Sequence, residues 1–163
     1  MGEIDHGLSK EELHDIVNAL RKARSRAYCP YSQFAVGCAI YTRGKVGPQG
    51  QALFGDEITI GWNIENASYG ATMCAERVAL YKTLGKISKA AASPQNWTAM
   101  AIVGSFGQKD PGDSCIITPW GQCRQVMSEF LQRRPRFPIL LFDPDFDEYI
   151  VTTMPELMPY PFN

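Results

Sequence analysis

The first part of the chain has the pattern of an amphipathic helix. Its apolar residues recur every three or four positions, as on one buried face of a helix. They are Leu13, Ile16, Val17 and Leu20. Ser9 followed by Glu12 forms a capping box, which predicts the start of the helix. The basic run RKARSR (21–26) suits the negative end of the helix dipole, so we interpret it as the helix terminus rather than as a nucleic-acid contact.

Several later segments have the apolar, β-branched and aromatic character of strands. They are FAVGCAIYT (34–42), ITIGWNI (58–64), WTAMAIVGS (97–105), FPILLFD (137–143) and EYIVTT (148–153). The glycine-rich connection between the first two, residues 43–57, predicts an extended loop or a long hairpin.

Two further helices are expected between these strands. One covers about 73–84, and the other starts with Pro119 in its first turn, where a backbone N–H is not needed. Residues 86–96 and 107–115 have the composition of connecting loops. The tail, 154–163, is too rich in proline for a long regular element.

This order of elements predicts an α/β fold. A helix, a hairpin and then strands separated by helices indicate a mixed five-stranded sheet sandwiched by helices, an α/β/α architecture. The length of 163 residues favours a single domain over residues 1–163.

Composition narrows the class of partner. The 16 basic and 17 acidic residues leave a net charge of −1, which does not favour nucleic acid as a partner. The N-terminal residues are polar and no long apolar run follows, so we expect no signal peptide, no membrane partner and a cytoplasmic protein. Five cysteines, an odd number, favour buried thiols or metal ligands over a disulfide framework.

Two of these cysteines stand where predicted helices begin. Cys74 opens the helix after the second strand, and Cys123 lies in the first turn of the helix after the third. Such helices start at one edge of the sheet, where the helix dipole lowers the pKa of a thiol and favours thiolate. Two converging thiolates favour Zn²⁺. Glu76 would share this pocket and could accept the proton of a metal-bound water.

Three blocks of sequence carry a resemblance to a known family. They are YCPYSQFAVGCAI (28–40), GWNIENASYGATMCAERVAL (61–80) and PWGQCRQVMSEF (119–130). In this order, the blocks resemble those of the small, homo-oligomeric, zinc-dependent cytidine deaminases. The ending PELMPYPF (155–162) is also similar to the end of that family.

The resemblance implies a metal centre with named supporting residues. Cys74 and Cys123 would bind zinc, and Glu76 would shuttle protons. Arg77 would donate to the cysteine thiolates and ease their mutual repulsion, with Gln125 as a second supporting residue behind the ligands.

The resemblance also implies the substrate contacts. Asn63 and Glu65 would hydrogen-bond the ribose hydroxyls, Phe34 would stack on the pyrimidine, and the backbone of Ala75 would contact the base edge. Structural alternatives exist, since Phe34 also suits a strand-end core position and Glu65 a turn. Cys29 and Cys38 carry no motif, so we interpret them as structural thiols.

The implied reaction belongs to pyrimidine salvage. A hydroxide held by zinc would attack C4 of cytidine or deoxycytidine, and Glu76 would deliver a proton to N3 and then to the leaving amine, giving uridine or deoxyuridine. Members of this family assemble as homo-oligomers, so we expect a tetramer. Tyr69 and Phe162 are the candidates for aromatic residues that reach a neighbouring site.

One residue departs from the family pattern. Trp120 stands where the third zinc ligand belongs, and an indole has no lone pair to offer a metal. We therefore expect weak or absent zinc, and we expect Trp120 to project into or against the pocket. Cys115 could replace the ligand only by a sharp fold-back.

Three interpretations stay open at this point. The protein is a deaminase with an altered zinc site, a non-catalytic nucleoside-binding homologue, or a variant form of an ordinary deaminase. Retention of Glu76 favours the first, and Trp120 favours the second.

Overall fold

The computed structural model describes residues 5–86, 93–106 and 115–162. Its helices are α1 (Lys10–Arg24), α2 (Ala75–Leu84), α4 (Gly121–Leu131) and the single turn α5 (Met154–Leu157). The strands of its main sheet are β1 (Phe34–Thr42), β4 (Glu57–Trp62), β5 (Trp97–Phe106), β6 (Ile139–Phe142) and β7 (Tyr149–Thr152). Two short 3₁₀ helices lie at Tyr69–Ala71 and Pro94–Asn96.

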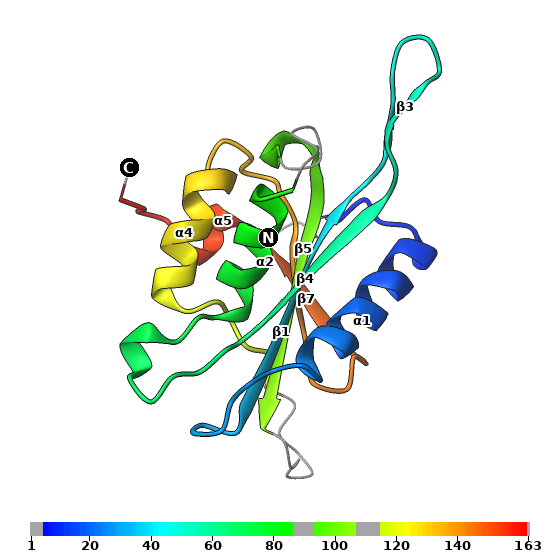
Figure 1. Cartoon of the computed structure of the whole chain (residues 1–163). Coiled ribbons are helices and arrows are strands. Elements are labelled where there is room, and N and C mark those ends of the chain that lie inside the picture. The colour runs from blue at the N-terminus through cyan, green and yellow to red at the C-terminus, as the bar shows by residue number, and fades with distance from the viewer. Residues whose placement is uncertain (1–4, 87–92, 107–114, 163) are drawn as a thin grey trace.

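The main sheet is mixed and has five strands in the order β4-β1-β5-β6-β7. Strand β1 runs antiparallel to both β4 and β5, whereas β5 and β6 are parallel and β7 returns antiparallel to β6. The predicted mixed five-stranded sheet is therefore confirmed. Residues 43–57 form the expected hairpin, with strands β2 (Lys45–Val46) and β3 (Ala52–Phe54), and it projects beyond the sheet (Figure 1).

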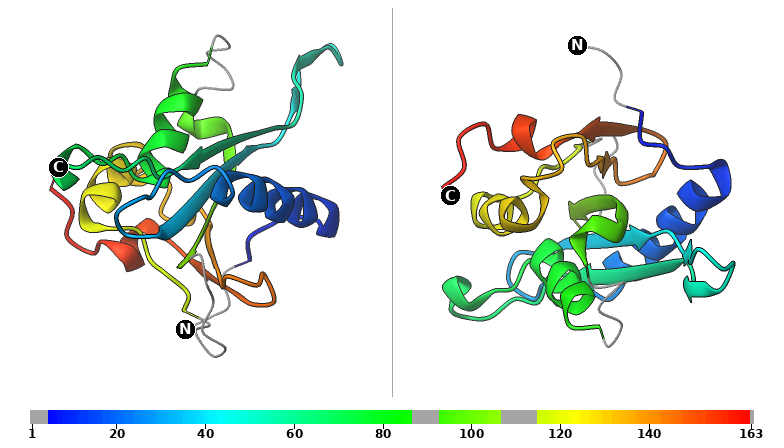
Figure 2. Two further views of the ribbon diagram at one scale, coloured as in Figure 1. Left: turned by 60° about the horizontal axis from the view of Figure 1, so that its bottom comes forward. Right: turned by 90° about the horizontal axis from the view of Figure 1, so that it is seen from above.

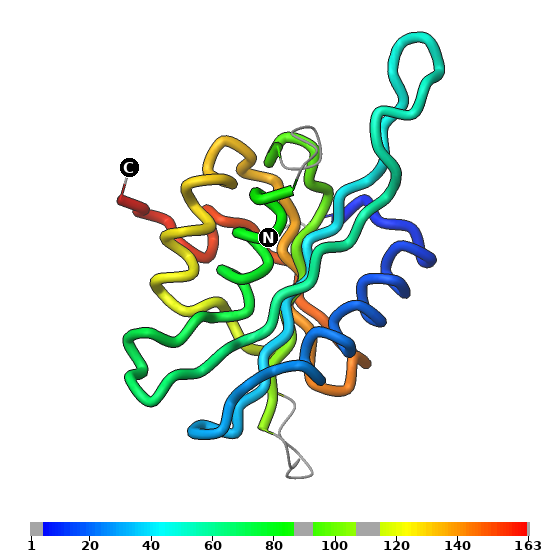
Figure 3. Tube along the Cα trace, in the orientation of Figure 1, coloured from blue at the N-terminus to red at the C-terminus, as the bar shows by residue number. Residues whose placement is uncertain are grey.

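The helices cover both faces of this sheet. Figures 1 and 2 show α1 on one face, and α2, α4 and α5 on the other. Successive side chains of β1 point to opposite faces of the sheet and so contribute to both layers. Ala39 and Tyr41 pack toward α1, while Cys38 and Ile40 pack toward α2. The tube in Figure 3 shows how the chain passes from one layer to the other through the strands.

The helix boundaries agree with the sequence pattern except at one start. The capping box of Ser9 and Glu12 is present at α1, as predicted. The expectation that Pro119 lies in the first turn of the next helix is wrong. Trp120 is the N-cap of α4, with extended backbone, so the helix begins at Gly121 and Pro119 precedes it. The element that the sequence pattern did not predict is α5, a single turn with its own capping box and with Pro155 at its start.

Two predicted connections lie mostly outside the described residues. They are the linker 86–96, of which 87–92 are not described, and the loop 107–115, of which 107–114 are not described. In the described part of the chain, no helix is both long enough and apolar enough to cross a membrane.

A close approach of α2 to the sheet depends on Gly61 in β4. A Cβ atom at this position would lie 2.3 Å from the carbonyl oxygen of Ala75 and 2.4 Å from the backbone nitrogen of Ala79. Only glycine lets the helix backbone approach the strand this closely. The contact fixes the start of α2, where Cys74 and Glu76 lie.

Candidate metal centre

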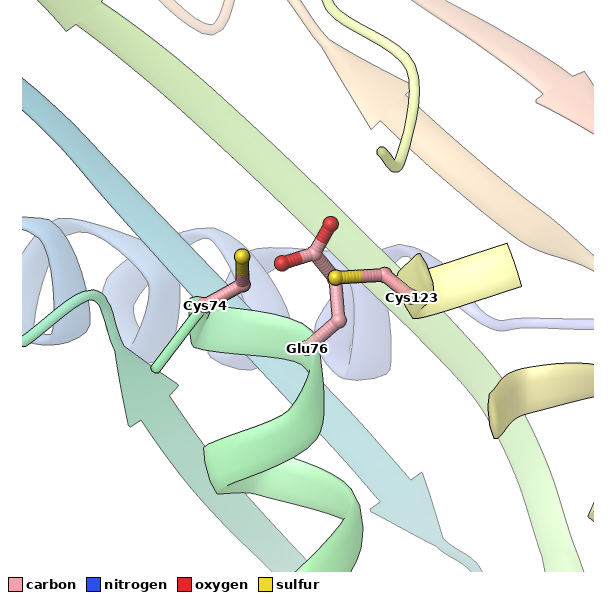
Figure 4. A group of neighbouring side chains, drawn as sticks. All are labelled: Cys74, Glu76 and Cys123. Atoms are coloured by element: carbon pink, nitrogen blue, oxygen red, sulfur yellow. The ribbon is translucent and has the colours of Figure 1, made fainter. Parts of the chain in front are cut away.

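Three side chains of types that can bind a metal meet on the face of the sheet that α2 and α4 cover (Figure 1). Cys74 is the N-cap of α2, Glu76 lies in its first turn, and Cys123 lies in the first turn of α4. Figure 4 shows these side chains pointing toward one another, and one ligand atom from each lies within 4.8 Å of the others. Among the described residues, this is the group with the spacing needed for a metal ion.

The start of α2 is held by a short bridge after β4. Ile64 and Met73 exchange backbone hydrogen bonds of 2.9 and 3.0 Å, which closes the loop between them. Cys74 follows Met73 directly. These backbone bonds therefore fix the position of the Cys74 backbone shortly after the end of β4.

The start of α4 is held by the side chain of Arg124. Its guanidinium donates to the carbonyl oxygen of Pro119 at 2.6 Å, to the hydroxyl of Thr118 at 2.7 Å and to the carbonyl oxygen of Leu157 at 2.9 Å. These bonds tie the segment before α4 to the turn α5. By holding the start of α4, they also fix the position of Cys123, which is fully buried.

The two cysteines share one negative charge unequally. Cys123 donates a hydrogen bond to Cys74, and Arg77 also donates to Cys74, so the pKa of Cys74 is lowered. The hydrogen bond to Cys74 is also the main cause that raises the pKa of Cys123, and burial and the charge of Glu76 add to it. These neighbours act against the helix dipole at Cys123, and the thiolate expected there stays a prediction.

Glu76 is a buried carboxyl whose side chain faces both sulfurs. The residue is 4% exposed, and this burial raises its pKa to about 7, with the charge of Cys74 adding to the effect. A carboxyl that titrates near neutral pH can both accept and release a proton under physiological conditions.

Arg77 lies behind Cys74 and supplies positive charge. Its Nη2 donates to the carbonyl oxygen of Thr72 at 2.9 Å and to the sulfur of Cys74 at 3.5 Å. Its Nε is buried and has no hydrogen-bond partner within the described residues. The guanidinium is therefore held for interaction with negative charge at the sulfur atoms.

Comparison with known proteins identifies the family. The family model for the cytidine and deoxycytidylate deaminase zinc-binding region matches residues 10–137. The chain belongs to this family. It is 30% identical over 154 residues to the cytidine deaminase of Sporosarcina psychrophila, covering 93% of this chain and 92% of that protein. It is 33% identical over 141 residues to the cytidine deaminase of Halalkalibacterium halodurans, covering 86% of each.

Solved structures of deaminases have the same architecture. The crystal structure of cytidine deaminase from Burkholderia pseudomallei superimposes with a TM-score of 0.68 at 33% identity, covering 95% of this chain and all of that one. The cytidine deaminase of Mycobacterium tuberculosis gives a TM-score of 0.59 at 28% identity, covering 93% and 98%. The resemblance found in the sequence is therefore confirmed at the level of family and fold.

Asn63 and Glu65, the two residues predicted to bind ribose, form hydrogen bonds with other residues of the chain. Asn63 donates to the carbonyl oxygen of Phe34 at 2.8 Å and accepts from the backbone N–H of Val36 at 2.9 Å. Glu65 accepts backbone N–H bonds from Tyr31 at 2.9 Å and Ser32 at 3.2 Å.

These bonds hold the loop before β1 against the loop after β4. Glu65 also accepts a hydrogen bond from the hydroxyl of Ser32. The partners of both residues come from the block 28–40, and nothing in the spacing of Asn63 and Glu65 pointed to them. Each residue keeps unused hydrogen-bonding capacity, since an amide has four sites and a carboxylate about four.

The predicted base-contacting residues lie at the same end of the sheet. Phe34 begins β1, is partly buried, and packs edge-to-face on Phe106 with ring centroids 4.8 Å apart. Ala75 lies between Cys74 and Glu76 and is fully buried. Its backbone, and not its side chain, is therefore the part that could contact a base.

Trp120 lies largely in solvent. The residue is 60% exposed, and the expectation that it projects into or against the pocket stays a prediction. The N-cap conformation turns the backbone before α4 and leaves the indole in solvent while Cys123 is buried. Cys115 is exposed and does not belong to the group formed by Cys74, Glu76 and Cys123.

The remaining predicted residues lie toward the C-terminal tail and the loop after β4. Gln125 donates to the carbonyl oxygen of Phe162 at 2.8 Å and accepts from its N–H at 3.3 Å, which fastens the tail to α4. The side chains of Phe162 and Tyr69 are exposed, so both are available to another molecule.

Proposed function

We propose that this protein deaminates cytidine or deoxycytidine by hydrolysis and releases ammonia. The observation that carries the proposal is the buried carboxyl of Glu76 beside two cysteine sulfurs, in a chain that belongs to the deaminase family. Its pKa of about 7 suits a group that must take up a proton and give it back within one reaction cycle.

Cys74 and Cys123 would hold a zinc ion in this site. Thiolate is a preferred zinc ligand, and the two sulfurs lie close enough to bind one ion. Arg77 would offset part of their charge, because its guanidinium already donates to Cys74. When bound, zinc lowers the pKa of a coordinated water and so makes a nucleophile available at neutral pH.

Glu76 would carry the protons of the reaction. Its carboxylate takes a proton from the attacking water and delivers it to N3 of the pyrimidine. It then takes the proton of the hydroxyl that has been added at C4 and transfers it to the amino group, which leaves as ammonia while the C4 carbonyl of the product forms. Burial keeps the carboxyl away from bulk water, so the proton it accepts is retained until the base takes it.

The nucleoside would lie at the end of the sheet where β1 begins and β4 ends. Phe34 would stack on the base, and the backbone of Ala75 would contact the base edge beside Glu76. Asn63 and Glu65 would use their remaining hydrogen-bonding sites on the ribose hydroxyls. Because both residues also hold the surrounding loops, their replacement should weaken folding and nucleoside binding together.

The direct test compares turnover in the native protein with turnover in Glu76→Gln. We expect the native protein to release ammonia from cytidine or deoxycytidine, and we expect kcat to fall by about 10²–10⁴ in the variant, since general acid–base catalysis contributes about that factor. Glu129→Gln, an exposed carboxylate on α4, is the matched control. Equal turnover in Glu76→Gln and the control would contradict the role of Glu76.

A second candidate function is nucleoside binding without catalysis, with weak or no zinc. Trp120 favours it, because the residue cannot serve as the third ligand. In that case cytidine would raise the melting temperature of the protein while no ammonia appears. Detectable turnover in the native protein would exclude this candidate.

We also expect a homotetramer, with Tyr69 and Phe162 reaching the site of a neighbouring subunit. Their exposure supports this assignment. Light scattering on the purified protein measures the number of subunits, and a monomer would contradict it.

A further inference from the structure

The unanswered question at the metal centre is which group takes the position that Trp120 cannot fill. A structural or catalytic zinc ion normally has at least three protein ligands. The two sulfurs of Cys74 and Cys123 supply two. Within the described residues, the third member of the group is the carboxylate of Glu76.

We infer that Glu76 is the third protein ligand of the metal when no nucleoside is bound. The inference rests on the proposed zinc site, but not on catalytic turnover. It assigns to Glu76 a contact with the metal in addition to its proposed work on protons.

Geometry supports this assignment. Zinc binds sulfur at about 2.3 Å and carboxylate oxygen at about 2.0–2.2 Å, so a tetrahedral site needs ligand atoms about 3.5–3.8 Å apart. The three ligand atoms here all lie within 4.8 Å of one another. A closure of about 1.3 Å at most brings them to a zinc ion, and small side-chain rotations on two helix starts are enough for that.

Charge supports it as well. Two thiolates and one carboxylate around Zn²⁺ leave a net charge of −1, the same as three thiolates would. Arg77 stands beside Cys74 with its Nε buried and without a described partner, and it matches that charge. With two thiolates alone the zinc site would be neutral, and the Arg77 guanidinium, whose Nε is buried, would have no net charge to balance.

The alternative donors are less well placed. Trp120 is 60% exposed and has no lone pair for a metal. Cys115 is exposed and lies outside the group. Glu76 is buried and faces both sulfurs (Figure 4).

The assignment has a consequence for the proposed reaction. One carboxylate cannot hold the metal and carry a proton at the same moment. Glu76 must therefore leave the metal when the nucleoside binds, and turnover should be slower than in a variant that regains a third thiolate. Trp120→Cys is that variant.

The test measures zinc affinity by competition with a chromophoric chelator in four proteins. They are the native protein, Glu76→Gln, Trp120→Cys and the double variant. We expect Glu76→Gln to weaken Zn²⁺ binding by at least about 100-fold in the native background, because even an outer-shell partner is worth 10–100-fold. In the Trp120→Cys background the same change should weaken binding by less than about threefold, since the third thiolate replaces the carboxylate.

Two controls separate this effect from general damage to the site. Trp120→Ala removes the indole without adding a ligand, so zinc affinity should stay within about threefold of the native value. Cys115→Ser should also leave affinity unchanged, and a loss comparable to that of Glu76→Gln would assign the third position to Cys115 instead. Thermal unfolding of each metal-free variant verifies that it is folded.

Cobalt gives an independent measurement of the ligand set. Co²⁺ bound to the native protein should show thiolate charge-transfer absorption for two sulfurs, and Trp120→Cys should increase it by about half. Glu76→Gln should shift the d–d bands in the native background only. An unchanged spectrum and unchanged affinity in Glu76→Gln would overturn the inference.

The outcome for the inference is distinct from the outcome for the proposed function. If the affinities follow the expected pattern but cytidine is not consumed, the metal assignment stands and the deaminase proposal fails. If cytidine is consumed but Glu76→Gln affects zinc equally in both backgrounds, the deaminase proposal stands and the metal assignment fails.

Discussion

Single residues in this protein carry more than one contact, and Glu12 is the clearest case outside the metal centre. Its carboxylate accepts from the backbone of Ser9 at 2.7 Å as part of the helix cap. It also accepts from the hydroxyl of Tyr41 at 2.7 Å and forms a two-bond ion pair with Arg43 at 2.6 and 2.7 Å. The local sequence predicted only the cap. Tyr41 and Arg43 lie at the end of β1, far from Glu12 in sequence, and only the tertiary fold brings them next to its carboxylate.

The Glu12 carboxylate should make the free energy of unfolding depend on pH. The Arg43 guanidinium lowers the pKa of Glu12 to about 2. The group therefore stabilises the folded state fully above its unfolded pKa of 4.5, and loses that contribution as the pH falls from 4.5 toward 2. Because the Arg43 side chain is 46% exposed, we expect about 1–2 kcal/mol rather than the full value of the shift.

Urea unfolding of the native protein and Glu12→Gln measures this effect. The variant should be less stable by about 1–2 kcal/mol at pH 7, and the difference should disappear near pH 2. Glu11→Gln, an exposed carboxylate in the same helical turn, is the matched control. A difference between native protein and Glu12→Gln that stays constant from pH 7 to pH 2 would contradict the assignment.

At the scale of elements, most helices and strands follow from local pattern. The apolar, β-branched and aromatic residues of 34–42 and the cap at Ser9 predicted β1 and α1 correctly. The start of α4 was placed too early, because a proline suits both the first helical turn and the residue before an N-cap. What local pattern cannot supply is the distance between elements, and the contact of α2 with β4 at Gly61 shows why.

We expect Gly61→Ala to separate α2 from the sheet. The new Cβ would overlap backbone atoms of Ala75 and Ala79, which cannot move aside as a flexible side chain can. The free energy of unfolding should fall by about 1–3 kcal/mol, as in other overpacked cores. Zinc affinity should fall too, because Cys74 and Glu76 move with the helix.

Chemical denaturation and chelator competition measure these two losses. Gly55→Ala is the matched control, since no atom lies within 4 Å of its added Cβ. Retention of native stability in Gly61→Ala would show that α2 does not need this close approach.

At the scale of the whole molecule, the candidate metal centre joins two separate connections between strands. Cys74 belongs to the connection from β4 to β5, and Cys123 to the connection from β5 to β6. A bound ion would link α2 to α4 across the same face of the sheet. The site should therefore stabilise the molecule as a unit, not only its own neighbourhood.

Zinc should raise the melting temperature of the protein. Saturation to about 100 times the dissociation constant adds about 2.7 kcal/mol, which corresponds to roughly 5–10 °C for a domain of this size. A chelator should reverse the rise. Differential scanning calorimetry measures it, with Cys74→Ser/Cys123→Ser as the control that should not respond, and an equal response in that control would contradict the site.

The sequence by itself determined the order of elements, the mixed sheet and the family, because hydrophobic periodicity, capping residues and compact motifs are local properties of the chain. It also placed Cys74 and Cys123 at helix starts. Only the tertiary structure decided that Cys74 is the more acidic thiol, that Asn63 and Glu65 hold neighbouring loops, and that Trp120 lies in solvent. Each of these depends on partners distant in sequence, whose charge, burial and hydrogen bonds exist only once the sheet brings them together.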